Sequence, residues 1–262
     1  MNIGDLTITS LETITAFDIA TNAYKFTLDE LQNATVAQAQ ETTDITGKAG
    51  RKLATLKRNK SVTVSGSNGL VSAGLLEMQT GSSFKNEATE VMWSDYLTVT
   101  GNKATTKYKA IGTTGAEIIA LYIQKNDGSI DSAPVQAEAA EAGKFAYNPE
   151  SKELTFTGIA DNTSIVVKYK RKVQADVLKD ESDTYSGKCT LYIDALAEDK
   201  CANTYRVQFY IPKADFSGEF SFEMGDNQTV HSFEATALAG ACGTKGEFFS
   251  YIVFGANAED AA

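Results

Sequence analysis

The sequence is poor in the residues that most often carry chemistry or covalent cross-links. It has one histidine, one tryptophan, three prolines and three cysteines in 262 residues. A Ser-His-Asp triad has only His231 available, and this residue falls in a predicted strand, which favours a structural role. The cysteines at 189, 201 and 242 are odd in number and match no zinc spacing, which favours free thiols. We therefore expect no metal, no cofactor and no enzymatic activity.

Long apolar runs are also missing. No stretch reaches the length of a transmembrane helix, and the N-terminal segment lacks the basic region and apolar core of a signal peptide. We expect no membrane partner and synthesis in a reducing cytoplasm. A phosphate-binding loop is excluded too, because Gly47 and Gly50 are three residues apart and Lys52 leads into an alternating run rather than a helix.

What the sequence does contain is typical of a β-rich globular protein. Hydrophobic residues make up 42% and charged residues 22% of the chain, which is ordinary for a folded domain. Threonine, valine, tyrosine and phenylalanine recur throughout and favour strands over helices. The fold class predicted is mainly β, a sandwich or partial barrel with one flanking helix.

The charge of the chain is acidic but unevenly distributed. A formal net charge of −10 argues against a general nucleic-acid binder. Residues 41–60 nevertheless carry six basic residues against two acids, whereas residues 215–262 carry eight acids against one lysine. Such asymmetry suits head-to-tail contacts between copies, although two unrelated solvated faces would look the same. The candidate subunit contacts are the six basic residues Lys48, Arg51, Lys52, Lys57, Arg58 and Lys60.

The first half of the chain predicts several elements. Alternation over residues 3–20 indicates a strand that forms an N-terminal arm and orders on a partner. The runs on either side of residues 58–60 indicate a hairpin that turns there. Helical spacing predicts a helix over about 67–80, with Ser67 or Asn68 as the N-cap, Gly81 as the stop and one sheet face covered.

The second half predicts further strands. Residues 91–99 form an aromatic strand that contains Trp93, expected in the core or, alternatively, at a subunit contact. A strand over 205–211 is expected to end at Pro212. Residues 220–238 read as a hairpin that places Phe233 and Ala235 on one face and Glu234 and Thr236 on the other.

Four segments together resemble the tail tube (major tail) proteins of long-tailed bacteriophages. They are the extended run from Phe26 to Val36, the glycine-basic turn from Ile45 to Lys52, the strand and helix from Ser61 to Gly81, and the closing strands between Tyr205 and Leu238. The resemblance covers roughly residues 20–100 and 185–255.

The resemblance implies a structural virion protein. Six copies would form a ring whose inner strands close into one barrel, and the rings would stack into a tube through which DNA passes without specific binding. The implied partners are other copies of the chain and other tail proteins, and the implied location is the virion tail, assembled in the host cytoplasm. Residues 1–103 and 176–262 would form the tube domain, and 104–175 an inserted β subdomain or extra strands.

Two other classes of protein fit the same composition. A capsid decoration protein or an adhesin-like domain would also be β-rich, but an adhesin needs an export signal. A carbohydrate-active enzyme would need a carboxylate pair beside aromatic residues in one cleft, and no pair in this sequence stands out.

Overall fold

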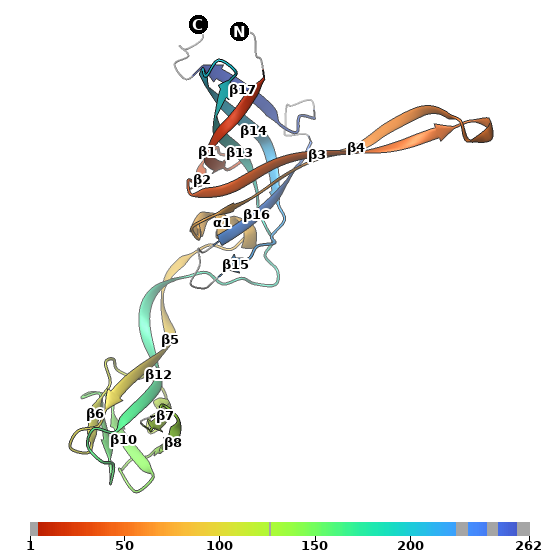
Figure 1. Ribbon diagram of the computed structural model, residues 1–262. Helices are drawn as coiled ribbons and strands as arrows, with labels where there is room; N and C mark the ends of the chain where they lie inside the picture. Colours follow the sequence, from red (N-terminus) through yellow and green to blue (C-terminus); the bar gives the residue numbers. More distant parts are fainter. Residues whose placement is uncertain (1–4, 126, 224–229, 240–245, 256–262) are drawn as a thin grey trace. The chain divides into compact units, whose positions relative to one another are not determined.

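The computed structural model describes residues 5–125, 127–223, 230–239 and 246–255. The described residues are mainly β, in mostly antiparallel sheets with one α-helix and no closed barrel, which confirms the predicted fold class. The chain divides into two compact units (Figure 1). Unit 1 comprises the residues up to Phe84 and from Leu178 onward, and unit 2 is Lys85–Val177.

Unit 1 is built on one nine-stranded sheet. The main path runs in the order β2 (Tyr24–Leu28), β1 (Leu6–Phe17), β13 (Lys188–Asp199), β14 (Thr204–Phe216), β16 (Val230–Ala237), β4 (Lys52–Asn68) and β3 (Leu31–Thr46). Two short strands join it, β15 (Phe222–Glu223) beside β16 and β17 (Ser250–Gly255) beside β14. The predicted strand at 3–20 is therefore no detached arm: β1 pairs with β13 along its length, so that part of the prediction is wrong.

Strand β14 changes partners along its length. On the side opposite β13, its first half pairs with β17 and its last residues pair with β16, so the sheet branches at β14. The prediction that this strand ends at Pro212 is wrong, because β14 continues to Phe216. The register with β13 shifts at this point, and Thr190 donates a hydrogen bond to the Pro212 carbonyl over 3.0 Å. A proline without an N–H is tolerated at such a bulge because it breaks no ladder bond there.

The core of unit 1 follows from alternation along the strands. Successive inward residues are almost fully buried on β1, β4, β13 and β16: Ile14, Ala16, Val62, Val64, Leu191, Ile193, Phe233 and Ala235. The predicted facing of the last hairpin is confirmed, since Glu234 is exposed and Phe233 is buried.

The helix α1 (Ala73–Thr80) covers this core with Leu75 and Met78. Its C-terminus is the predicted one: Gly81 adopts a left-handed conformation with φ 72°, and its N–H bonds to the Glu77 carbonyl. Its N-cap is Ser72, whose hydroxyl accepts from the Leu75 N–H, so the prediction of Ser67 or Asn68 is wrong. Those two residues remain in β4 because β16 and β3 pair with them on either side.

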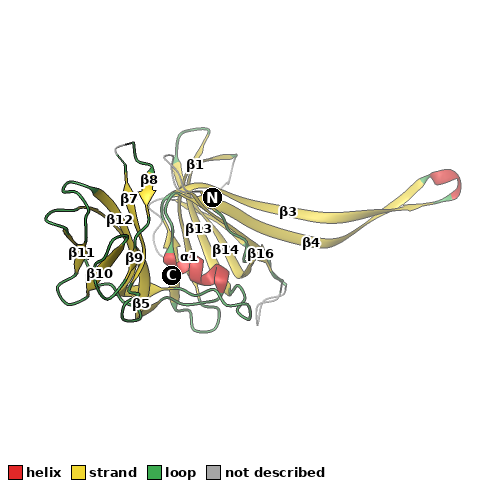
Figure 2. Cartoon of the chain, turned by 90° about the horizontal axis from the view of Figure 1, so that it is seen from below, coloured by secondary structure: helices red, strands yellow, loops and turns green. Residues whose placement is uncertain are grey.

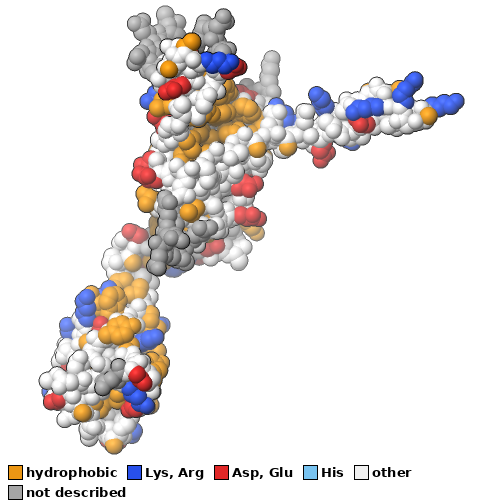
Figure 3. Space-filling model, in the orientation of Figure 1, with side chains coloured by type: hydrophobic (Ala, Val, Ile, Leu, Met, Phe, Trp, Pro, Cys, Tyr) orange, Lys and Arg blue, Asp and Glu red, His pale blue; other side chains and the backbone are white. Residues whose placement is uncertain are grey.

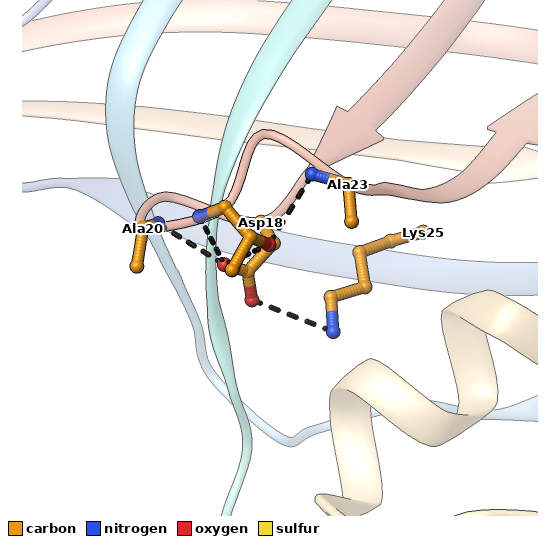
Figure 4. Close-up of polar contacts among 5 residues, drawn as sticks. Asp18, Ala20, Ala23 and Lys25 are labelled. Atoms are coloured by element: carbon orange, nitrogen blue, oxygen red, sulfur yellow. Dashed lines mark hydrogen bonds and ion pairs between the residues drawn. The ribbon is translucent and has the colours of Figure 1, made fainter.

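The turn between β1 and β2 is fixed by one carboxylate (Figure 4). Asp18 accepts hydrogen bonds from the backbone N–H groups of Ala20 and Thr21, and its other oxygen lies 3.5 Å from the Lys25 amine. The hydrogen bonds from Thr21, more than the charge of Lys25, lower the pKa of Asp18 to about 2. This ionised side chain holds β2 against β1 at one edge of the sheet.

Unit 2 consists of two four-stranded sheets around a second core. One sheet contains β5 (Lys85–Thr98), β12 (Ser164–Val177), β7 (Ile118–Gln124) and β8 (Ile130–Ser132). The other contains β6 (Lys103–Thr105), β11 (Glu153–Phe156), β10 (Lys144–Asn148) and β9 (Val135–Gln136). Leu121, Phe145, Leu154 and Tyr169 are among the buried residues between them. Trp93 is partly buried and packs against this core, which agrees with the first of the two roles expected for it.

Candidate assembly surfaces

The most conspicuous feature of unit 1 is a two-stranded arm, residues 39–61, formed by the outer parts of β3 and β4 (Figures 1 and 2). Nearly every residue of this arm is exposed, and burial begins at Val62 where β4 enters the sheet. A two-stranded ribbon without a core is only marginally stable in water. Packing within its own chain therefore does little to stabilise the arm, which makes the arm a candidate contact surface.

The arm turns at its far end, around the short 3-10 helix η1 (Lys48–Gly50). Ala49 and Gly50 there have φ values of 63° and 72°, and the Gly47 N–H closes the turn onto the Arg51 carbonyl over 2.7 Å. The predicted turn at residues 58–60 is wrong: β4 runs through it without reversal. Asn59 is instead a bulge with φ 51°, where the pairing shifts between Ala39 and Glu41.

The six predicted contact residues all lie on the arm, but they are not equivalent. Lys52 forms an ion pair with Asp44 over 2.7 Å, and Arg58 donates to the Thr43 hydroxyl over 2.9 Å. Lys60 lies over the ring of Phe248, 5.6 Å from its centroid. The side chains of Lys48, Arg51 and Lys57 are exposed, and no described residue forms an ion pair or hydrogen bond with them. Figure 3 shows basic side chains gathered toward the far end of the arm.

The arm also carries an apolar strip, which sequence reasoning missed. Ile45 pairs with Ala54 and Thr43 pairs with Leu56, so Ile45 and Leu56 lie on one face as diagonal neighbours. They are 42% and 50% exposed. The alternation of apolar and polar residues in each strand was visible in the sequence. Whether Ile45 and Leu56 share a face depends on the register between β3 and β4, which the sequence does not show.

Unit 1 has open sheet edges in the part of the chain that the structure describes. β2 pairs only with β1, β17 only with β14, and β3 only with β4. β17 is apolar and accessible: Tyr251 and Ile252 are 46% and 42% exposed, and Tyr251 packs 4.9 Å from the ring of Phe209. An exposed apolar edge strand is a template for pairing with another strand.

The negative charge of the chain is concentrated in unit 1. Unit 2 has 11 basic and 12 acidic residues, a net of −1, and the rest of the −10 therefore belongs to unit 1. Only part of the acidic segment at 215–262 can be assigned to an unpaired acidic surface. Asp215 lies 3.6 Å from Lys188, with which it forms an ion pair. Asp226, Glu259 and Asp260 fall outside the described residues. Glu219 and Glu234 are exposed.

His231 is completely buried and serves the attachment of α1 to the sheet. Its Nδ1 accepts from the Ser72 N–H over 3.3 Å, and its Nε2 lies 2.8 Å from Gln79 Oε1. Burial lowers the pKa of His231. These contacts assign a structural role to the chain's one histidine.

The described residues contain no group of three His, Cys, Asp or Glu side chains that could hold a metal ion. A hollow of about 510 Å³ in unit 2 is lined by Asp131 and Lys144, but these pair with Lys125 and Glu141 respectively. No helix in the described ranges is long and apolar enough to cross a membrane.

Comparison with known proteins gives one clear result. A search among curated proteins finds no match. The family model of the YomU/Tube protein family matches residues 6–251, which is nearly the whole chain and includes the arm, β2, unit 2 and the first two residues of β17. The chain therefore belongs to the YomU/Tube protein family and is a phage tube-like structural protein.

Proposed function

We propose that this chain polymerises as stacked hexameric rings into the tube of a phage tail, a conduit for DNA ejection. The observation that carries the proposal is the arm at residues 39–61, a long exposed ribbon on a member of a tube family. It has no core of its own, it carries an excess of positive charge, and it presents an apolar strip. These are the properties of a surface completed by a second copy.

The arm supplies one contact between copies. Lys48, Arg51 and Lys57 bind acidic surface on a neighbouring unit 1, while Ile45 and Leu56 supply the apolar part. Because the donor and acceptor surfaces differ, the contact is head-to-tail and repeats without self-pairing.

The sheet edges supply the other contact. β17 of one copy pairs with β2 of the next, so that the sheets join around a ring. A closed ring leaves neither of these two edges free, which limits this contact to a defined number of copies. The acidic character of unit 1 then keeps the lumen from retaining DNA, because like charges repel the phosphate backbone. In this arrangement unit 2 is carried by the tube as an inserted β domain.

The direct test is negative-stain microscopy of the purified protein at high concentration, with light scattering coupled to size-exclusion chromatography. Hollow six-fold rings or tubes are expected. A wild-type chain that remains monomeric at all concentrations would contradict the proposal.

An arm deletion sharpens this test. Ala39 pairs with Ser61, so replacing residues 40–60 by Asn-Gly closes a short hairpin without disturbing Val62 and Val64 in the core. This variant should fold with an unchanged circular dichroism spectrum and form no tubes. Tubes of normal length from it would remove the arm from the assembly.

A charge reversal isolates the electrostatic part. Arg51→Glu with Lys57→Glu is preferred to a variant at Lys52, whose charge is already neutralised by Asp44. The matched control reverses Lys168 and Lys172, two exposed residues on β12. Each exposed pair contributes only about 0.2–1 kcal/mol, so we expect a raised critical concentration rather than abolished assembly. Equal effects of the two double variants would argue against a specific basic contact.

A further inference from the structure

Unit 2 contains a cluster in which two cations lie over a pair of aromatic rings and a third cation lies beside them. Trp93 and Tyr108 meet edge to face, with ring centroids 5.1 Å apart. The Arg171 guanidinium carbon lies 3.6 Å from the Tyr108 centroid and 4.6 Å from that of Trp93. The Lys107 amine lies 5.4 and 5.7 Å from the same two centroids, and Lys152 donates to the Lys107 carbonyl over 3.3 Å.

The positive charge of this cluster is not balanced locally. Neither Lys107 nor Arg171 forms an ion pair with a described carboxylate. Asp95 touches the cluster, but its oxygens accept from three neutral donors: the Trp93 indole N–H, the Lys107 backbone N–H and the Tyr169 hydroxyl. The Nε of Arg171 is buried without a hydrogen-bond partner. None of the three cations is therefore paired with a described carboxylate.

The cluster is also held rigidly. The Tyr108 N–H donates to the Tyr169 hydroxyl over 3.0 Å, and the Thr106 hydroxyl donates to the Tyr108 carbonyl over 2.8 Å. Tyr169 is buried and in turn donates to Asp95 over 2.7 Å. The segment that carries Lys107 and Tyr108 is thus fixed before any ligand arrives, which is what a binding site requires.

We propose that Lys107, Lys152 and Arg171 form a binding site for a phosphate group. Stacking of Arg171 on the rings by itself would be explained as a cap on the end of the core. That explanation also covers the Lys107 amine, but it leaves out Lys152 and leaves the buried Nε of Arg171 without a hydrogen-bond acceptor. A phosphate oxyanion supplies an acceptor for all three cations, because guanidinium and ammonium groups both bind it by charge-assisted hydrogen bonds.

The chain provides its own reporter for this site. Trp93 is the sole tryptophan and lies in the cluster, so its fluorescence reports on ligand binding. The full chain is titrated with inorganic phosphate and pyrophosphate, and with sodium chloride at matched ionic strength. A saturable change with the phosphates and none with chloride supports the proposal, whereas the same curve for all three salts means screening alone and overturns it.

Variants assign the effect to residues. Lys107→Gln with Lys152→Gln should weaken the apparent affinity about tenfold or more, as expected for lost charge-assisted hydrogen bonds. Lys109→Gln is the control, because Lys109 is paired with Glu150 over 2.6 Å. Near-ultraviolet circular dichroism checks that each variant is folded. Equal weakening by the control, or unchanged affinity in a folded double variant, would overturn the site.

The source of the phosphate is decided by a further titration with a linear poly(glycerol phosphate). Affinity that rises with polymer length identifies a phosphodiester polymer as the ligand. Binding of pyrophosphate but not of the polymer identifies a free phosphate. The site rests on unit 2 alone, so its test is independent of whether the chain forms tubes.

Discussion

Protonation of His231 should loosen the attachment of α1 to the sheet of unit 1. The ring accepts from the Ser72 N–H at Nδ1, which fixes it as the neutral tautomer with its proton on Nε2, facing Gln79 Oε1. Gln79 is oriented by its own bond to the Ser232 carbonyl, 2.9 Å long. A second proton, on Nδ1, would point at the Ser72 N–H, so that two donors would face each other without an acceptor. It would also place a buried positive charge beside Phe222, whose ring centroid lies 4.8 Å from that of His231.

The sign of the pH effect follows from the lowered pKa of His231, whose cause is burial. Below the unfolded pKa of about 6.5 the unfolded chain binds a proton that the folded chain does not. The contribution of His231 to the free energy of unfolding is therefore fully present above about pH 6.5. It falls as the pH drops toward the folded pKa, with a limiting slope of about 1.4 kcal/mol per pH unit. The chain has one histidine, so no second histidine contributes in this range.

Denaturant unfolding between pH 5.5 and 8 measures this slope. Circular dichroism follows both units, and Trp93 fluorescence follows unit 2 alone, which contains no histidine and serves as the internal control. A transition seen by circular dichroism but not by fluorescence is that of unit 1. In His231→Asn the amide oxygen can still accept from Ser72, but the contact to Gln79 is lost, so we expect a cost of about 1–3 kcal/mol at pH 8. Its pH profile should be flat. A slope in His231→Asn equal to that of the wild type would refute the reasoning.

Two further predictions concern the core of unit 1. Leu75 is fully buried under α1, so Leu75→Ala should lower the free energy of unfolding by about 2–5 kcal/mol, whereas Leu70→Ala, at a residue 59% exposed, should change it by less than about 0.5 kcal/mol. Equal losses in the two denaturation curves would mean that the helix is not packed on the core. Burial raises the pKa of Cys189 to about 12, so a thiol reagent should label the exposed Cys201 at once and Cys189 only on unfolding. In a Cys242→Ser background only Cys189 and Cys201 remain, so one rapidly labelled thiol is expected. Rapid labelling of two thiols would contradict the burial of Cys189.

Several elements could be predicted from the sequence because their signals are local. Alternation of period two placed Phe233 and Ala235 on the buried face, and Gly81 marked the end of α1. Composition indicated a mainly β fold, and the run of six basic residues in 41–60 was visible without any structure. Each of these depends on residues close together in the chain, so no knowledge of distant partners was needed.

Other features were decided only by pairing between distant strands. Residues 58–60 looked like a turn, yet β3 and β4 continue past them to form the arm, with Asn59 as a bulge. Residues 3–20 looked like a free arm, but β13, which is far away in the sequence, makes β1 an interior strand. The cations at Lys107, Lys152 and Arg171 are scattered along the chain and meet only in unit 2. Local periodicity determines that a segment is a strand, whereas its neighbour, its register and therefore its function depend on long-range contacts that no single segment encodes.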